Sequence, residues 1–147
     1  MINKEKFEKV RLKNGDILVE KSGGSPIQPV GRVAIIDDVK TDFAFSNFLQ
    51  VIRIKKQECL PEYLFCFLKA LYSLNYMEYI QNQTTGIKNL IMEEFLSIPV
   101  SLPSINKQKE IARQYKNKWE AAEQLQEESI KILKKAKEKV ERIILEE

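Results

Sequence analysis

Few residues of this chain have the types and spacing that catalysis requires. Asp16, Glu20 and Lys21 form an acid, acid, lysine series like that of metal-dependent nucleases. Adjacent residues of a strand point to opposite faces, however, so Lys21 leaves the strand away from Glu20. Asp37 and Asp38 can hold Mg²⁺, although paired acids at the end of a strand are typical of a solvated turn. The sequence therefore gives weak support to a nuclease.

Other catalytic signatures are missing. The chain has no histidine, the commonest general base and neutral metal ligand. It has no phosphate-binding loop, no dinucleotide loop and no Cys/His metal cluster. These absences predict that the chain is not an enzyme by itself and that it uses no metal or cofactor.

Binding chemistry is better represented than catalysis. Residues 21–36, 50–57 and 79–92 contain basic residues and no acid. The net charge of +3 permits a nucleic-acid partner without arguing for one. The three segments either share one positive face or are unrelated solvated loops.

Glycine and proline divide the chain into two parts. All five glycines and all five prolines lie within residues 1–103. Together with short apolar runs, they predict a small mixed α/β domain. Residues 104–147 have neither and predict one long helix, with Ser104 or Asn106 as its N-cap.

Local signals place the elements of the first part. Asn14-Gly15 predicts a turn that leads into a strand at 17–19. Pro61 opens a helix, because its missing N–H costs nothing at the first helical position. Short apolar runs predict strands at 30–36 and 48–54 and a short helix at 91–96. A polar stretch with a central glycine predicts a loop at 81–89, and two prolines predict an extended segment at 98–103.

The C-terminal helix carries an apolar stripe that one helix cannot bury alone. The apolar residues of this stripe recur every three, four or seven positions, as in a coiled coil. The expected helix-pairing residues are Ile111, Tyr115, Trp119, Ala122, Leu125, Ile132, Leu133, Ala136, Val140 and Ile143. The stripe predicts a partner helix from another chain.

Cysteine content and hydropathy also indicate in which cellular compartment the protein occurs. Cys59 and Cys66 are too far apart for a disulfide if both lie on a helix, which predicts buried, reduced thiols. No apolar run is long enough to span a membrane, and the first residues do not form a secretory signal. We therefore expect a cytoplasmic protein.

The order of these motifs resembles a known family. Residues 15–19, the Ser22-Gly23-Gly24 loop and residues 30–34 look like the middle of a target recognition domain from a type I restriction-modification specificity subunit. Residues 84–90 are similar to the glycine-containing loop of that family. Residues 98–111 are similar to its proline-rich exit into a long spacer helix. The family often has a second proline where Ser104 stands and a glutamate where Lys107 stands.

The resemblance implies an α+β protein with a partial target recognition domain, 1–103, and a spacer or dimerisation helix, 104–147. It implies sequence-specific binding of double-stranded DNA, in which basic side chains neutralise phosphates, short polar side chains read base edges and glycines let the backbone approach closely. The candidate DNA-binding residues are Lys21, Ser22, Gly23, Gly24, Ser25, Arg32, Arg53, Lys55, Gln83, Thr84, Thr85, Gly86, Lys88 and Asn89. It also implies assembly with methyltransferase and restriction subunits on a bipartite target. The partner of the helix would be a second copy or another specificity half. The competing interpretation is a structural adaptor that assembles through its long helix without binding DNA.

Overall fold

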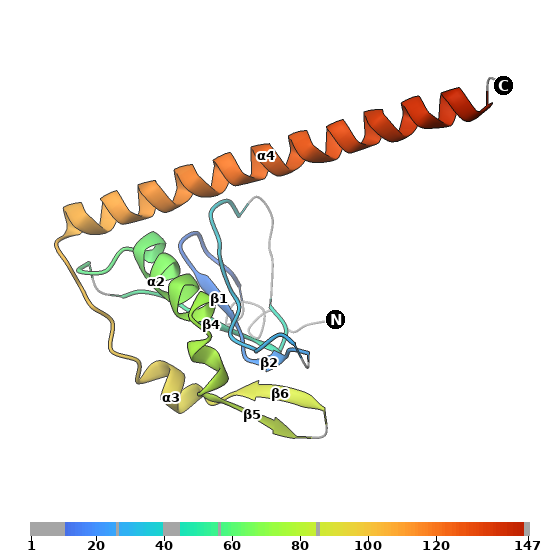
Figure 1. The fold of residues 1–147 in the computed structure, drawn as a ribbon. Helices are drawn as coiled ribbons and strands as arrows, with labels where there is room; N and C mark the ends of the chain where they lie inside the picture. The colour runs from blue at the N-terminus through green and yellow to red at the C-terminus, as the bar shows by residue number, and fades with distance from the viewer. Residues whose placement is uncertain (1–10, 26, 40–44, 56, 85, 146–147) are drawn as a thin grey trace. The chain divides into compact units, whose positions relative to one another are not determined.

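The computed structural model describes residues 11–25, 27–39, 45–55, 57–84 and 86–145. By their contacts these residues form two compact units, Met1–Ile111 and Ala112–Glu147. The first unit holds small antiparallel sheets and short helices, and the second is helical (Figure 1). The predicted α+β fold is confirmed.

The first sheet is built around β1 (Ile17–Glu20). It pairs antiparallel with β3 (Val33–Ile35) on one side and with β4 (Leu49–Ile52) on the other. Ile17 and Val19 are fully buried, whereas Leu18 between them and Glu20 after them are partly exposed. The alternation shows that one face of β1 covers the core. The predicted strands at 30–36 and 48–54 exist, but they are shorter than their apolar runs.

Helix α2 (Pro61–Ser73) begins at the predicted proline and packs against the first sheet. Leu64 and Leu68 face the core that Ile17 and Val19 also line. The helix ends at Ser73, and two residues later Asn75 has a left-handed φ of 58°, a conformation that asparagine tolerates. The 3₁₀ turn η1 (Tyr76–Glu78) follows and places Met77 in the core.

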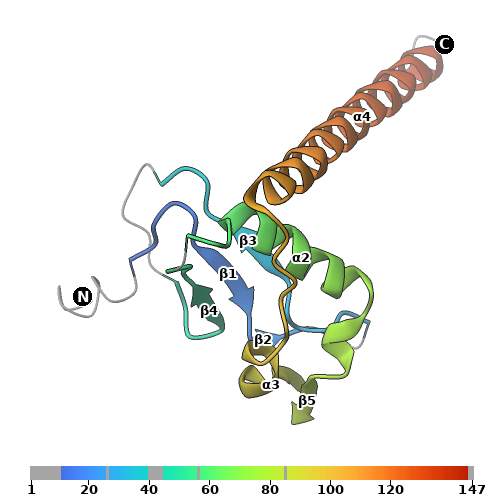
Figure 2. The same ribbon diagram turned by 90° about the vertical axis from the view of Figure 1, so that its left-hand side faces the viewer.

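The second sheet contains β2 (Ser22–Gly23), β6 (Ile87–Leu90) and β5 (Gln81–Thr84), in that order (Figure 1). Figure 2 shows β1 leading directly into β2. The prediction that residues 81–89 form a loop is wrong, because β5 and β6 form a hairpin there. Both faces of this hairpin are largely polar, so the alternation that identifies a half-buried strand is absent. Helix α3 (Met92–Leu96) follows, as predicted, and buries Phe95.

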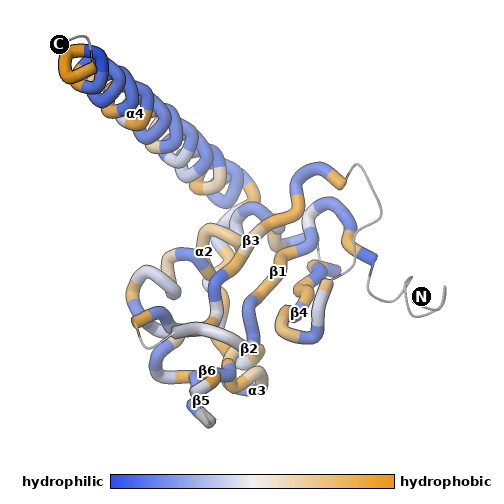
Figure 3. Tube along the Cα trace, turned by 90° about the vertical axis from the view of Figure 1, so that its right-hand side faces the viewer, coloured by the Kyte–Doolittle hydropathy of each residue, from blue (hydrophilic) through white to orange (hydrophobic). Residues whose placement is uncertain are grey.

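Helix α4 (Ile105–Leu145) is a continuous helix of 41 residues. Ser104 is its N-cap, since its Oγ accepts a hydrogen bond from the Lys107 N–H at 3.4 Å. Along the tube of Figure 3, hydrophilic residues dominate this helix and hydrophobic ones recur at intervals. From Trp119 to Leu145, the large apolar side chains are at least half exposed.

Gln108 fixes the first turn of α4 to the rest of the first unit. Its side chain is fully buried. Its Oε1 accepts a hydrogen bond from the Leu60 N–H at 2.9 Å. Its Nε2 donates to the carbonyl oxygens of Glu58 at 2.8 Å and Pro103 at 2.9 Å. One glutamine thereby satisfies three backbone groups beside the start of α2.

We expect Gln108→Leu to lower the free energy of unfolding by roughly 2 to 3 kcal/mol, because it leaves the Leu60 N–H buried without an acceptor. Urea denaturation measures this loss. Lys109→Leu introduces the same side chain at an exposed position of the same helix and should change stability by less than about 0.5 kcal/mol. Equal losses in the two variants would contradict the role of Gln108.

Candidate nucleic-acid interface

Two candidate DNA-binding segments that are far apart in the sequence meet in the second sheet. Strand β2 pairs with β6 so that Ser22 lies opposite Asn89 and Gly23 opposite Lys88. Strand β5 pairs with the other edge of β6, with Asn82 opposite Asn89 and Gln83 opposite Lys88. We call this three-stranded sheet the ribbon. It combines the segments 21–25 and 81–89 into one surface.

One face of the ribbon carries three short polar side chains side by side, which we call the polar row: Ser22, Asn89 and Asn82. The Ser22 hydroxyl donates to Oδ1 of Asn89 at 2.7 Å. This bond holds the Asn89 carboxamide in one orientation and directs its NH₂ group elsewhere. Asn82, at the end of the row, is exposed. Such side chains can bond base edges in a groove of DNA.

The other face of the ribbon joins the core at one end. Leu90 is buried, and the Oε1 of Gln81 beside it accepts a hydrogen bond from the Val30 N–H at 3.1 Å. Gln83 and Lys88 lie further along the same face. This attachment fixes the base of the hairpin, while its turn at Gly86, with φ of 87°, extends away.

Gly24 allows the chain to turn sharply after β2. Its φ is 69°, and a Cβ at this position would come within 2.9 Å of the Gln28 carbonyl oxygen. Ser25 and Gln28 then close a tight turn through two backbone hydrogen bonds. The aliphatic part of Lys88 lies against Gly24, where a Cβ would be 3.3 Å from its Cδ. The Lys88 side chain therefore crosses the ribbon toward this turn.

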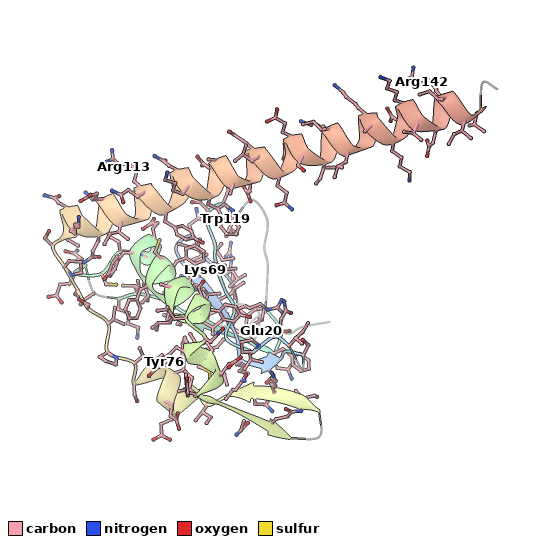
Figure 4. The ribbon with its side chains drawn as sticks, viewed as in Figure 1. Glu20, Lys69, Tyr76, Arg113, Trp119 and Arg142 are labelled. Atoms are coloured by element: carbon pink, nitrogen blue, oxygen red, sulfur yellow. The ribbon has the colours of Figure 1, made fainter. Side chains whose placement is uncertain are left out.

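Arg32 is held beside the ribbon by an ion pair. Its Nε and Nη2 donate to the two carboxylate oxygens of Glu20 at 2.9 and 2.7 Å. The hydrogen bonds from Arg32 lower the pKa of Glu20 below its usual value. Glu20 comes directly before Lys21 in the chain and is labelled in Figure 4. The positive charge of Arg32 thus lies near the ribbon, but the negative charge of Glu20 partly balances it.

Arg53 is fixed at the opposite end of β1. Its Nε and Nη2 donate to the two oxygens of Asp16, each at 2.6 Å. The Asp16 side chain is buried, while that of Arg53 remains 43% exposed. Burial alone would raise the pKa of Asp16, but the hydrogen bonds from Arg53 and from the Lys13 N–H outweigh burial and lower it. Asp16 is therefore an ionised structural group, not one of a set of metal ligands.

The structure thus separates the candidate residues into two groups. The ribbon and its connections contain Lys21, Ser22, Gly23, Gly24, Ser25, Gln83, Thr84, Gly86, Lys88 and Asn89, with Arg32 beside them. Arg53 and Lys55 follow β4 at the far end of the first sheet. Thr85 lies outside the described residues. Sequence reasoning missed Asn82, although it lies between Gln81 and Gln83 in an acid-free segment.

Comparison with known families identifies the family of the chain. The family model described as the type I restriction modification DNA specificity domain matches residues 2–142. The chain belongs to this family. The match spans both the ribbon and α4, so a specificity domain here includes both parts. None of the curated proteins matches the chain.

Two negative findings apply to the described part of the specificity domain. None of its helices is both long and apolar enough to cross a membrane. Its described residues include no group of three His, Cys, Asp or Glu side chains placed to hold a metal ion. Cys59 and Cys66 are free thiols, and burial raises the pKa of both. Cys66 is buried, as predicted, whereas Cys59 precedes α2 and is only partly buried.

We expect Arg53→Ala to lower the free energy of unfolding by roughly 2 to 3 kcal/mol at pH 7, because it leaves the Asp16 carboxylate buried without its partner. The pKa of Asp16 is lowered in the fold. Its stabilising contribution is therefore complete above its usual pKa and is lost as the pH falls through the folded value. Urea denaturation from pH 7 to acid should show the difference from wild type shrinking.

Lys55→Ala is the matched control, since it removes an exposed cation two residues away. We expect it to change stability by less than about 0.5 kcal/mol at every pH. A pH-independent loss in Arg53→Ala would contradict the assignment to the Asp16 pair.

Proposed function

We propose that the chain is a sequence-specific DNA-binding subunit of a type I restriction-modification system and that the ribbon is its reading surface. The observation that carries this proposal is the convergence of the segments 21–25 and 81–89 in one narrow sheet. A two-stranded β-ribbon, such as the hairpin of β5 and β6, fits the major groove of B-DNA, where each base pair presents its own pattern of donors and acceptors. Asn82 and Asn89 of the polar row lie on this hairpin.

Affinity would come from the cations around the ribbon. Lys21 and Lys88 belong to the ribbon or adjoin it, and Arg32 lies next to Lys21 through its bond to Glu20. Phosphate contacts from these side chains would fix the orientation of the protein on the duplex without reading sequence. Arg53 and Lys55, at the other end of β1, would contact a more distant part of the backbone.

The side-chain amides of the polar row would read the bases. An asparagine can form two hydrogen bonds with adenine, donating to N7 and accepting from N6. Exposed Asn82 meets this requirement directly. Asn89, whose Oδ1 is already bonded to Ser22, would act chiefly as a donor. Gln83 and Ser25, the other polar candidates with described side chains, would add contacts beside the polar row. Thr84 and Thr85 stay candidates by residue type alone.

Chemistry would be supplied by other subunits in the cytoplasm. In this proposal the chain performs no reaction itself. It positions methyltransferase subunits, and for restriction a translocase-nuclease subunit, on a two-part target. The exposed stripe on α4, which includes Trp119, Leu133 and Val140, would pair with a helix of a second specificity half.

A structural adaptor remains the second candidate function. The mixed charges of α4 favour an adaptor, since a helix that carries both positive and negative charges is suited to assembly with another protein. A gel-shift assay with a pool of duplexes separates the two, because an adaptor would show no salt-dependent binding.

We expect Lys21→Ala with Lys88→Ala to weaken binding to every duplex and to flatten the salt dependence of affinity. Each lost phosphate contact should reduce the slope of log K against log salt by about 0.9. A salt titration of binding measures the slope. Lys109→Ala, an exposed cation on α4, should leave it unchanged, and an unaltered slope in the double variant would remove both lysines from the phosphate contacts.

We expect Asn82→Ala to relax sequence preference at one base pair of the target, with a loss of discrimination of roughly 1 to 3 kcal/mol. Selection from a randomised duplex pool, followed by competition binding, identifies the position. Asn106→Ala, the same substitution at an exposed site on α4, should leave the preference intact. If Asn82→Ala selects the same sequence as the parent with equal stringency, the polar row does not read bases.

A further inference from the structure

The face of the ribbon that carries the polar row also carries an apolar side chain. Ile87 is two residues from Asn89 along β6 and lies opposite Thr84 of β5. Because successive side chains of a strand alternate between its two faces, Ile87 is on the same face as Asn89. The hydrogen bond from Ser22 to Asn89 identifies this as the face of the polar row. The proposed reading surface therefore includes an isoleucine.

Ile87 does not belong to the hydrophobic core. Its side chain is 46% exposed, and the described apolar cluster around Ile17 and Leu68 does not include it. Leu90 attaches the hairpin to that core from the opposite face of β6. At the tip of the hairpin, a Cβ added to Gly86 would meet no described atom within 4 Å. The fold therefore presents Ile87 outward, close to the free end of the hairpin.

Strand formation alone does not require an apolar residue at position 87. A threonine has the same branch at Cβ and is equally favoured in an exposed strand. A single exposed apolar side chain is ordinary on a protein surface, so its surroundings decide what it means. Here the surrounding side chains on the same face, Ser22, Asn82 and Asn89, all form hydrogen bonds or are able to form them. Ile87 adds an aliphatic group to a surface that is otherwise suited to polar contacts.

Thymine presents the group that suits such a mixed surface. In the major groove the edges of the base pairs offer hydrogen-bond donors and acceptors, and thymine adds an apolar 5-methyl group. Contact between an aliphatic side chain and this methyl group removes apolar surface of both from water, which is favourable. Cytosine has a hydrogen at the same place and gains no comparable contact. An isoleucine beside two asparagines can therefore distinguish the two pyrimidines.

We infer that Ile87 is a specificity-determining residue that contacts the 5-methyl group of a thymine in the DNA target. The inference rests on the proposed function, because it requires the face of the polar row to enter the major groove. Positions 87 and 89 are two residues apart in an extended strand, which is about 6.7 Å. Successive base pairs of B-DNA are about 3.4 Å apart along the axis. The thymine should therefore lie within about three base pairs of the position that Asn82 reads.

A uracil scan of the DNA target tests the contact from the side of the DNA. Uracil lacks the 5-methyl group of thymine but keeps its hydrogen-bonding groups. In the duplex selected from a randomised pool, each thymine is replaced by uracil in turn. The wild-type chain should bind about four-fold more weakly with uracil at one position, as expected for the loss of one buried methyl group. That position should lie near the one that Asn82→Ala relaxes. Equal binding throughout, or a selected target without thymine in that interval, would overturn the inference.

Variants of Ile87 test the contact from the side of the protein. Ile87→Ala should reduce the four-fold preference for thymine over uracil to nearly none, because its short side chain no longer covers the methyl group. Ile87→Val keeps the branch at Cβ and most of the aliphatic surface, so it should retain most of the preference. Neither variant should shift the urea midpoint, since the side chain is exposed. A purely structural role would weaken binding of both duplexes and leave their ratio unchanged, which would contradict the assignment to Ile87.

Ile27 provides the matched control. Its side chain is 91% exposed, and it lies outside the ribbon in the tight turn between Ser25 and Gln28. Ile27→Ala should keep the full ratio between the thymine and uracil duplexes. A wild-type chain that selects a sequence but is indifferent to uracil would overturn the role of Ile87 and leave the proposed function standing. A wild-type chain that selects no sequence would overturn both.

Discussion

The peptide backbone at Lys21 belongs to both sheets of the first unit, and the arrangement of the ribbon depends on it. The Lys21 N–H donates to the Phe48 carbonyl oxygen beside β4, and the Lys21 carbonyl oxygen accepts from the Leu90 N–H of β6. Strand β1 therefore continues into β2 without a free loop. Because β1 is anchored by buried Ile17 and Val19, the core fixes the position of β2 and of every strand that pairs with it. The polar row is thus placed by apolar burial several residues away.

The ion pairs at the two ends of β1 explain why arginines and lysines have different roles in this domain. Each of the two arginines beside the first sheet has a planar group that matches a carboxylate, and each bonds both oxygens of an acid on or next to β1. These pairs stiffen the two ends of the strand. The lysines at 21 and 88 have flexible stems that can follow a phosphate backbone. The rigid cations support the scaffold, and the flexible ones remain suited to a ligand whose position varies.

Much of the fold could be predicted because its signals are local. Asn14-Gly15 marks a turn, Pro61 starts a helix, and the absence of glycine and proline after Pro103 predicts the continuous α4. The hairpin of β5 and β6 could not be found in this way, since Leu90 is its only buried residue among those with a described side chain. Candidate residues in 21–25 and 81–89 were identified by type, but their convergence depends on strand pairing across more than sixty residues. Gln108 was missed as an anchor because a glutamine among lysines is typical of a solvated helix face.

Gln108 shows how one buried amide can fix the start of a long helix. It has all its partners within one chain, so it is satisfied as soon as the first unit folds, and it gives the start of α4 a single position. Further along, the large apolar side chains from Trp119 to Leu145 are at least half exposed. The position of the first turn of α4 therefore depends on the hydrogen bonds of one polar side chain, and not on burial of the apolar residues from Trp119 onward.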